Sequence, residues 1–582
     1  MQNAENQEIP FGINLTKRYV SEGAEKHLFK KDIINNHGEI ILVDYMGSDS
    51  TIERVATLGF GTEIFPEKPY QRDFVHYLAN NGILEPFKSV QLKFSIQSPI
   101  ETALTFVYEP TVNVNEYSGR YSVMIDTSLT HSIENILVFN PALSSEKARE
   151  IQNLFIQGRQ IAYRTYKELI ELDLARELSR SCLGIDNDTR YFWKIDLLSL
   201  ANFIKKQRAL LPIHSHTRNY VEHVASIAKE ISPYGWEALM HPNTTHLTLT
   251  MPTDDEIVDP PLNPPLWKPK ETKRVIVSSL EEILFTPHQL LNHGQLQAVD
   301  YMGDDSSFAQ AARTSYGEGT KKIQDDQNLI KSLIRDLHTT PIEMAELSIE
   351  SKTPVFVDPR QAGRHRTLDN HGFMGYTPIG SQFYFPNNEE FKYQDRLNRQ
   401  GREKAMKEEE KARAKVILEE RLKSQQELSR KLRELGAPEF IVRNAKGVGF
   451  YTKRWRTGET HNWNHYLMLR LDSHAQKEIQ EQAKLINEIH RLHTPTANEA
   501  LNTYIINALR LNEKEISLII NQKMLRPDID IEDLNTYKGI GFVIKKIYKE
   551  GNIILDEQGN PVLELGREGL AFKEKLKKLL GR

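Results

Sequence analysis

The chain has 582 residues, of which 39% are hydrophobic and 26% are charged, values typical of a globular protein with more than one core. Its formal net charge of −4 excludes binding to nucleic acid or to an acidic membrane through an overall basic field. The single cysteine, Cys182, excludes an intramolecular disulfide framework and a multi-cysteine zinc site, so we expect a protein of the reducing cytoplasm. The polar N-terminus is unlike a signal peptide and no apolar run has the length of a membrane span, so we expect no membrane association.

An internal repeat organises the chain. The sequence VDYMG at 43–47 recurs at 299–303, an offset of 256, and further matches keep their order as far as Ser98-Pro99 and Thr353-Pro354. A repeat of this length predicts two diverged copies of one domain. We place copy one at 1–250, a proline-rich linker at 251–275, copy two at 276–525 and a C-terminal extension at 526–582.

The predicted elements follow the same order in both copies. Each copy begins with a strand, continues with a helix and a second strand, and then forms a long helix. The strand sequences are ILVDYM and VQLKFSI in copy one and LQAVDYM and AELSIES in copy two. In copy two the long helix is predicted over 391–435, where Glu, Lys and Arg are typical of a solvated helix face. The extension is predicted to form short strands joined by glycine-rich turns.

The stretch from Glu116 to Arg120 could bind an anionic, hydroxylated ligand. The guanidinium of Arg120 matches a phosphate, and Ser118 adds a hydroxyl group. Gly119 would let the backbone approach a ligand, and Glu116 could accept a hydrogen bond from a ribose hydroxyl or a base. An exposed loop with a local ion pair explains the same residues equally well.

Three stretches of copy two carry further candidate residues. Arg364-His365-Arg366, just after Gln361, could hold a pyrophosphate or an electron-rich flavin ring, although a surface ion-pair cluster is the commoner case. His338 in HTTPIEMAE could contact a ligand or cap an element together with Thr339 and Thr340. The stretch 467–479 is predicted to be one helix bearing Arg470, His474 and Gln476, for which an ordinary polar face is the alternative.

Together these stretches resemble the flavin-dependent thymidylate synthases. The signature of that family begins with Arg-His-Arg, present in copy two at 364–366, and ends with Asn-Glu-x-Ser-x-Arg-Tyr, present in copy one at 115–121. HTTPIEM and LRLDSHAQKEI in copy two, and 179–204 in copy one, also resemble the family. The resemblance implies an α+β fold, with two diverged copies of a thymidylate synthase-like domain, each a mixed sheet with long helices, and a small C-terminal extension.

The resemblance also implies an activity. It is the reductive methylation of dUMP to dTMP, with FAD as cofactor and with NADPH and methylenetetrahydrofolate as co-substrates. The partners would be small molecules and no nucleic acid, membrane or metal is expected. Two chains would form a homodimer that imitates the homotetramer of the family.

Residue roles follow from the family pattern position by position. Arg470 would be catalytic and would stabilise the uracil as it loses its N3 proton. Cys182 lies outside the retained segments and is not expected to be a nucleophile. The dUMP-binding residues would be Gln361, Glu116, Ser118, Gly119, Arg120, Arg443 and its copy-one equivalent Arg180. The FAD-binding residues would be His338, Thr340, Arg364, His365, Arg366, Glu116, Asn202, His461 and His465.

The departures from the family pattern are complementary between the copies. Copy one lacks the flavin-contacting His, the Gln, the cationic triplet and the catalytic Arg, and has Ile83, Thr105, Tyr108-Glu109-Pro110 and Pro212 there. Copy two lacks the back half of the signature and has Asp369, His371, Gly372, Met374 and Tyr376 there. We therefore predict one composite site, in which Gln361 and Arg470 of copy two face Glu116–Arg120 of copy one, and an inactive mirror site.

Two other functions stay open. The chain could be a non-catalytic nucleotide- or flavin-binding relative, or it could modify another pyrimidine nucleotide with flavin chemistry. Relaxed selection would erode the two copies independently, whereas the losses are complementary, and this favours an enzyme.

Overall fold

The structure is a computed structural model, and its described residues fall into two compact units. The first unit contains Met1–Lys392 and Ala405–Leu501, and the second contains Tyr393–Lys404 and Asn502–Arg582. The first unit contains copy one and copy two as far as Leu501, except for Tyr393–Lys404. The described residues are 13–58, 71–119, 122–213, 215–242, 268–314, 323–357, 369–371, 382–394, 402–437, 441–442, 446–472, 475–508, 544–546, 548–549, 552–553, 563–565, 573 and 575–577.

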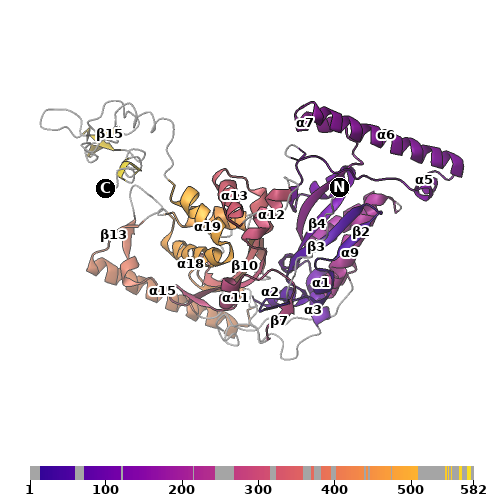
Figure 1. Cartoon of the computed structure of the whole chain (residues 1–582). Coiled ribbons are helices and arrows are strands. Elements are labelled where there is room, and N and C mark those ends of the chain that lie inside the picture. The colour runs from indigo at the N-terminus through magenta and orange to yellow at the C-terminus, as the bar shows by residue number, and fades with distance from the viewer. Residues whose placement is uncertain are drawn as a thin grey trace. The chain divides into compact units, whose positions relative to one another are not determined.

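Each copy combines a sheet with long helices, as predicted; the sheet has five strands, and the strand orders of the two copies are equivalent (Figure 1). The copy-one order is β2-β3-β4-β6-β5, and the copy-two order is β11-β14-β10-β9-β8. Neighbouring strands pair antiparallel, and a parallel bridge joins Leu28 to Leu42. The strands are β2 (Lys31–Ile34), β3 (Gly38–Met46), β4 (Gln91–Pro99), β5 (Asn113–Glu116) and β6 (Asp188–Asp196), then β8 (His288–Leu290), β9 (Gly294–Met302), β10 (Glu346–Pro354), β11 (Asp369–His371) and β14 (Tyr451–Glu459).

Helices and short turns surround both sheets. Copy one has α1 (Glu22–His27), α2 (Asp49–Thr57), α3 (Gln71–Asn80), η1 (Glu85–Ser89), α4 (Ile100–Val107), α5 (Ile133–Phe139), α6 (Ser145–Glu171), α7 (Arg176–Ser179), η2 (Arg180–Cys182), α8 (Leu197–Leu210), α9 (His216–Ile231) and α10 (Pro233–Met240). Copy two has α11 (Ser278–Ile283), α12 (Asp305–Thr314), α13 (Ile323–Arg335), η3 (Thr340–Met344), η5 (Asn388–Glu390), α15 (Glu408–Glu434), α17 (Thr460–Arg470), α18 (Lys477–His493) and α19 (Pro495–Leu501). No described helix is long and apolar enough to cross a membrane.

The core explains why these segments form these elements. In α9, apolar residues recur every three or four positions and turn one buried face toward the sheet, namely Tyr220, Val224, Ile227 and Ile231. Ser215 caps this helix by accepting a hydrogen bond from the backbone N–H of Arg218. Trp193 on β6 packs edge-on against Phe106, with 5.0 Å between ring centroids. The buried face of α9 and the aromatic side chains of α4 and β6 therefore belong to one hydrophobic core around the sheet.

Two helix predictions were wrong in extent. The long helix of copy two begins at Glu408 rather than near 391, because residues before it form the hairpin of β12 (Lys392–Gln394) and β13 (Arg402–Ala405). Three glutamates at 408–410 begin the helix, where negative charge interacts favourably with the helix dipole. The predicted single helix at 467–479 is two helices, since α17 ends at Arg470 and α18 begins at Lys477. A turn in which the Ala475 N–H donates to the Asp472 carbonyl separates them.

The end of the predicted linker forms β7 (Lys270–Thr272), which pairs antiparallel with β1 (Asn14–Thr16) of copy one. The two copies are thus joined within a single chain. In the second unit, β15 (Ile544–Lys546) pairs with β18 (Leu563–Leu565), and β16 (Tyr548–Lys549) pairs with β17 (Asn552–Ile553). These short strands agree with the predicted character of the C-terminal extension.

Candidate functional site

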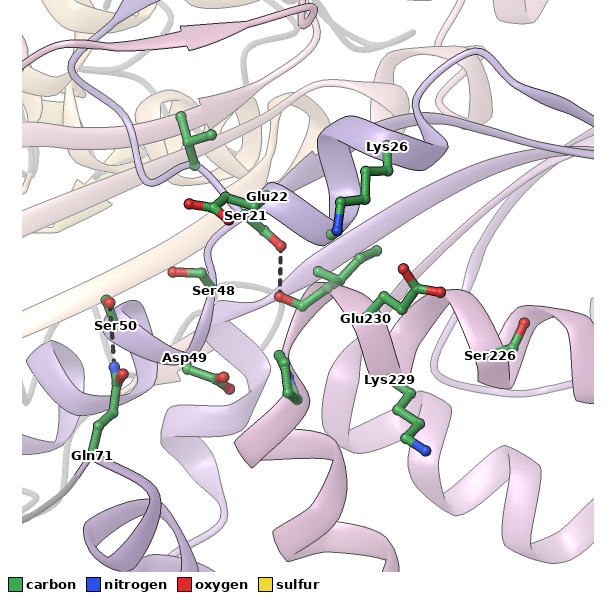
Figure 2. Close-up of a pocket in the computed structure, with 14 residues that line it drawn as sticks. Ser21, Glu22, Lys26, Ser48, Asp49, Ser50, Gln71, Ser226, Lys229 and Glu230 are labelled. Carbon is green, nitrogen blue, oxygen red and sulfur yellow. Dashed lines mark hydrogen bonds between the residues drawn. The ribbon is translucent and has the colours of Figure 1, made fainter.

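A recess of about 710 Å³ lies between α1, α2 and α9 of copy one (Figure 2). None of the predicted site residues lines it. Its polar groups serve the fold, since Ser21 Oγ donates to the Ile231 carbonyl at 2.8 Å and Asp49 accepts from the backbone N–H of Tyr234 at 3.1 Å. Its charged side chains include both signs, for example Lys26 and Glu230. The recess is a junction of helix ends and not the predicted site.

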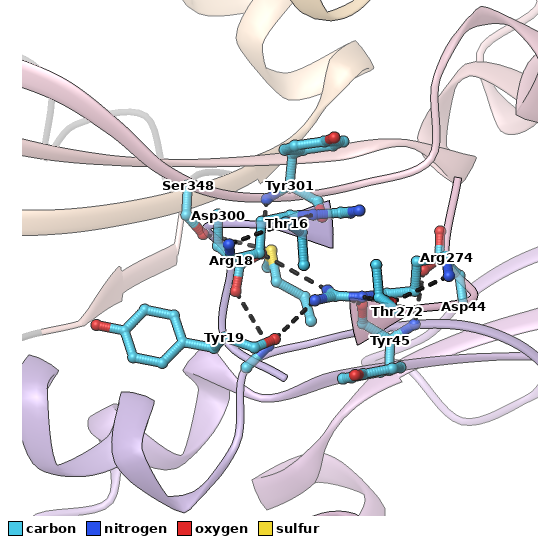
Figure 3. Close-up of polar contacts among 12 residues, drawn as sticks. Thr16, Arg18, Tyr19, Asp44, Tyr45, Thr272, Arg274, Asp300, Tyr301 and Ser348 are labelled. Carbon is cyan, nitrogen blue, oxygen red and sulfur yellow. Dashed lines mark hydrogen bonds and ion pairs between the residues drawn. The ribbon is translucent and has the colours of Figure 1, made fainter. Parts of the chain in front are cut away.

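The two copies meet around a pair of buried arginines that are 256 positions apart (Figure 3). Arg18 Nη1 donates to the Tyr301 carbonyl at 3.1 Å, and Arg274 Nη1 donates to the Tyr45 carbonyl at 3.0 Å. Each guanidinium also lies over the ring of the same tyrosine, at 3.9 Å and 4.3 Å from the centroid. Both arginines are fully buried. The interface therefore has an approximate twofold axis within one polypeptide.

Two glycines with positive φ complete this symmetric contact. Gly47 has φ of 77° and its N–H donates to Asp300, while Gly303 has φ of 70° and its N–H donates to Asp44. A side chain at Gly47 would be strained by this backbone conformation and would come within 2.6 Å of the Ser89 carbonyl. The glycine of the VDYMG repeat thus lets the end of each strand approach the other copy.

The segment that carries Glu116 is held against copy two. Thr340 Oγ1 on η3 donates to Asn115 Oδ1 at 3.3 Å, and Asn113 Nδ2 donates to Glu343 Oε2 at 3.2 Å. The amide of Asn115 also donates to the Ala311 carbonyl of α12. The edge strand β5 of copy one is therefore fastened to the turn that follows His338 in copy two. The structure brings together two of the segments that the sequence predicts to share a site.

Glu116 is oriented by its own copy. Its Oε1 accepts a hydrogen bond from the hydroxyl of Thr189 on β6 at 2.9 Å. Burial by the surrounding protein raises the pKa of Glu116, while the bond from Thr189 and the nearby charge of Arg180 oppose this rise. One oxygen of this carboxylate is thus oriented by β6.

Gly119 lies close to side chains of its own copy. A Cβ at this position would lie 2.7 Å from Met124 Sδ and 3.2 Å from Arg180 Cδ. The missing side chain therefore makes room for Met124 and Arg180. As a consequence, Arg180 lies beside the Glu116–Gly119 segment, which agrees with its predicted place in the site.

Copy two contributes the residues around η3 and α17. The backbone N–H of His338 donates to the Leu333 carbonyl at 2.8 Å, so the residue closes α13 through its main chain while its side chain is exposed. The Thr460 N–H donates to the Ala345 carbonyl at 3.0 Å and joins the start of α17 to the end of η3. This helix carries His461 and His465 in its first two turns and ends at Arg470.

Several residues of the predicted FAD set lie on these elements. Copy two supplies imidazoles and a hydroxyl at His338, Thr340, His461 and His465, and copy one supplies the Glu116 carboxylate. His461 lies near Glu343. Burial raises the pKa of Glu343, and the hydrogen bond from Asn113 and the nearby Lys194 and His461 oppose this rise only in part. Arg180 and Arg470 are described, whereas the following candidate residues lie outside the described residues: Arg120, Gln361, Arg364, His365, Arg366, Gly372, Met374, Tyr376, Arg443 and His474.

A buried ion pair links the copies beneath this site. Lys194 Nζ on β6 of copy one lies 2.9 Å from Glu346 Oε2 and 3.6 Å from Glu459 Oε1 of copy two. Burial alone would lower the pKa of Lys194, but the two carboxylates together raise it. Glu459 directly precedes α17 as its N-cap residue. A cation from one copy thus holds the start of the helix that carries Arg470 in the other copy.

The corresponding segments of copy one make contacts within their own copy. The segment that replaces the cationic triplet follows α4, where the Phe106 carbonyl accepts from Trp193 Nε1 at 3.1 Å and Thr105 lies half-buried. Glu109 pairs with Lys206 of α8 at 3.2 Å instead of facing a ligand. Asn202, predicted for the FAD set, lies on α8, the helix of copy one that follows β6 as α17 follows β14 in copy two.

Sequence reasoning missed Thr189 and Lys194. Both lie on β6, and their roles depend on the register of β5 against β6 and on the contact between copies. A signal was present for Lys194, because β6 is buried along nearly its whole length and a lysine in such a strand requires a partner. No pattern in the sequence indicated which carboxylates that partner would supply.

Comparisons with known proteins agree with the repeat. The family model described as thymidylate synthase complementing protein matches residues 41–234 and again 297–496. The flavin-dependent thymidylate synthase of Rickettsia bellii is 35% identical over 262 residues, covering 43% of this chain and 89% of the relative. The enzyme of the same name from Ruegeria pomeroyi is 37% identical over 259 residues, covering 42% of this chain and 82% of the relative. A solved structure of the UMP/dUMP methylase PolB from Streptomyces cacaoi, bound with 5-Br UMP, is 22% identical with a TM-score of 0.33, and covers 38% of this chain and 97% of that chain.

Proposed function

The chain belongs to the flavin-dependent thymidylate synthase family, with two copies of the family domain in one polypeptide, and we propose that it converts dUMP to dTMP at one composite site between them. The observation that carries this proposal is the attachment of β5 to η3. It places the Glu116 segment of copy one beside the His338 and Thr340 segment of copy two. The complementary losses in the two copies favour a working enzyme over a relative that only binds nucleotide or flavin.

The reaction would take its carbon from methylenetetrahydrofolate and its reducing equivalents from NADPH. FAD would supply the hydride chemistry, held by His338, Thr340, His461 and His465 together with Arg364, His365 and Arg366. The role of this chain is to bind and polarise the nucleotide. Arg470 would pair with the negative charge that develops on the uracil when N3 loses its proton.

The nucleotide itself would be held from copy one. Glu116, oriented by Thr189, would accept a hydrogen bond from the base or ribose, and Ser118 would donate one. Arg120 would bind the phosphate as a planar fork, and Arg180, which lies beside Gly119, would add a second cation. Gln361 and Arg443 would complete the dUMP set from copy two.

Removal of the proposed phosphate contact tests whether the site binds a nucleotide, and titration with several nucleotides tests which base it prefers. We expect Arg120→Ala to weaken dUMP binding by at least about tenfold, the value of one charge-assisted contact, while FAD binding is retained. Equilibrium titration with dUMP, dCMP and dTMP measures both affinity and base preference. The matched control is Arg190→Ala, because Arg190 is a nearby arginine whose Nε donates to Gln97 at 2.7 Å. Unchanged dUMP binding by Arg120→Ala would remove this part of the proposal, and tighter binding of dCMP would favour another pyrimidine substrate.

Two chains would associate through the long helices. In the described part of α6, apolar side chains such as Leu154 (62% exposed) and Ile161 (54% exposed) are open to solvent, and on α15 Val416 (51%) and Ile417 (56%) are equally open. We expect a native mass of two chains by mass spectrometry or light scattering. An active species of four chains would contradict the homodimer.

A further inference from the structure

One part of the contact between the copies is symmetric and does not distinguish copy one from copy two as a partner. Arg18 and Arg274 have the same neighbours, and so do their companions Glu25 and Glu281. Thr272 Oγ1 donates to Glu25 at 2.6 Å, as Thr16 Oγ1 donates to Glu281 at 2.6 Å. Because both copies carry the same residue types at these positions, a copy would make the same contacts with a second copy of its own kind. These bonds therefore hold a pair together without deciding which copies form it.

A second set of contacts is asymmetric. Arg54 Nη2 on α2 of copy one lies 2.7 Å from Glu350 Oε2 on β10 of copy two. Lys194 of copy one reaches Glu346 and Glu459 of copy two as described above. The side chains of Lys194, Glu346 and Glu350 are at most 2% exposed. In all three ion pairs the cation belongs to copy one and the carboxylate to copy two.

The equivalent positions in the opposite copies carry none of these ion pairs. The strand registers place Thr457 at the position of Lys194, and they place Gln91 and Ser95 at the positions of Glu346 and Glu350, while Glu459 has the carboxylate of Asp196 as its counterpart. The offset of 256 places Gln310 at the position of Arg54. The twofold symmetry of the interface is thus broken in charge and in one direction only.

Association of two copies of the same kind would therefore leave buried charges without a partner of opposite sign. Two copies of the second kind would bring together six carboxylates from Glu346, Glu350 and Glu459 without Arg54 or Lys194 to neutralise them. Two copies of the first kind would place each Arg54 opposite Ser95, and each Lys194 would keep only Asp196 in place of the two carboxylates Glu346 and Glu459. A buried charge that loses its partner is strongly destabilising, and a wrong pair is rejected by such contacts more than a right pair is attracted.

We propose that complementary buried charges determine which copies associate, so that copy one pairs only with copy two. The cations are Arg54 and Lys194 on copy one, and the carboxylates are Glu346, Glu350 and Glu459 on copy two. The partner that fits this face of copy one is copy two, and a second copy one is excluded. Each pair then contains one Glu116 segment facing one Arg470 helix. The inference concerns assembly, so its test does not depend on turnover of dUMP.

A disulfide across the pseudo-twofold axis reports the pairing directly. Leu15 on β1 and Glu271 on β7 are register partners, and such Cα atoms lie about 4.5–5.5 Å apart in an antiparallel ladder, within reach of a disulfide. Leu15 is 65% exposed, so its replacement leaves the core intact. The reporter is the full chain with Leu15→Cys, Glu271→Cys and Cys182→Ser. The fraction bridged within the chain is measured at a fixed ratio of oxidised to reduced glutathione.

Charge reversal at the Arg54–Glu350 pair then tests this proposal. We expect Arg54→Glu or Glu350→Arg alone to lower the equilibrium constant for the bridge by about tenfold or more, because like charges then face each other. The double reversal should restore it to within about threefold of the reporter. Lys31→Glu is the matched control, since Lys31 pairs with Glu39 inside copy one, and it should leave the bridge unchanged.

Two results would overturn the inference. The first is a bridge equilibrium that is insensitive to the single reversals, or a double reversal no better than the singles. The second is a covalent dimer of chains with Leu15→Cys as their only cysteine that forms at the same glutathione ratio as the bridge of the reporter, because an exposed cysteine would reach that stability against its own counterpart only if two first copies paired. Thermal unfolding of each variant shows whether the chain is folded under the conditions of the disulfide measurement.

Discussion

Arg470→Ala is expected to lower the rate of dTMP formation by about 10²–10³-fold, the loss typical when one preorganised group that stabilises transition-state charge is removed. The residue ends α17, and the start of this helix is fixed by the Thr460 N–H bond to η3 and by the Glu459–Lys194 ion pair. Loss of the guanidinium should therefore affect charge stabilisation and leave the helix in place. The measurement is the steady-state rate with saturating dUMP, FAD, NADPH and methylenetetrahydrofolate.

The control for this variant is Arg208→Ala. Arg208 lies near the end of α8, the mirror helix, and forms an exposed ion pair with Glu222 at 2.7 Å. It should retain nearly full activity, because the mirror half lacks the other site residues. A rate for Arg470→Ala within a factor of three of the unaltered chain would remove Arg470 from the catalytic role.

Lys194→Met is expected to lower the free energy of unfolding by about 3–5 kcal/mol, because it leaves Glu346 and Glu459 without their buried counter-charge. Burial raises the pKa of Glu346, and Lys194 is the cation that opposes this rise. Adding Glu346→Gln should recover part of the loss, since one uncompensated carboxylate is then removed. Urea and thermal unfolding of the full chain measure both effects.

A surface lysine serves as the comparison for Lys194. Lys205 is exposed on α8, and Lys205→Met should change stability by no more than about 0.5 kcal/mol. If Lys194→Met proved as stable as Lys205→Met, the ion pair between the copies would not contribute to the free energy of unfolding. Partial recovery in the double variant would show that the loss comes from the uncompensated charge rather than from packing.

The strands and the repeat could be predicted because their signals are local. The repeated VDYMG sequences mark β3 and β9, and the strands VQLKFSI and AELSIES lie in β4 and β10 as expected. The division of the signature between copies also predicted that copy one and copy two would face each other. The structure supports the part of this that it describes, in which Asn115 contacts Thr340.

The remaining features depend on contacts between distant segments. The turn between α17 and α18 follows a stretch with ordinary helical composition, so periodicity alone extended the helix past Arg470. The role of Gly119 depends on Arg180, sixty-one positions later in the chain (180 − 119), whose side chain fills the space of the missing Cβ. The partners of Lys194 belong to the other copy, and only the register and the pseudo-twofold axis bring them together.

The central claim is that the two copies share one working site, and tritium release from C5-labelled dUMP tests it most directly. The purified chain is supplied with FAD, methylenetetrahydrofolate and NADPH and is compared with Arg120→Ala from copy one and Arg470→Ala from copy two. The account predicts release by the unaltered chain and loss of release in both variants. Release that persists when either half is altered, or no release from folded protein with bound flavin, would contradict it.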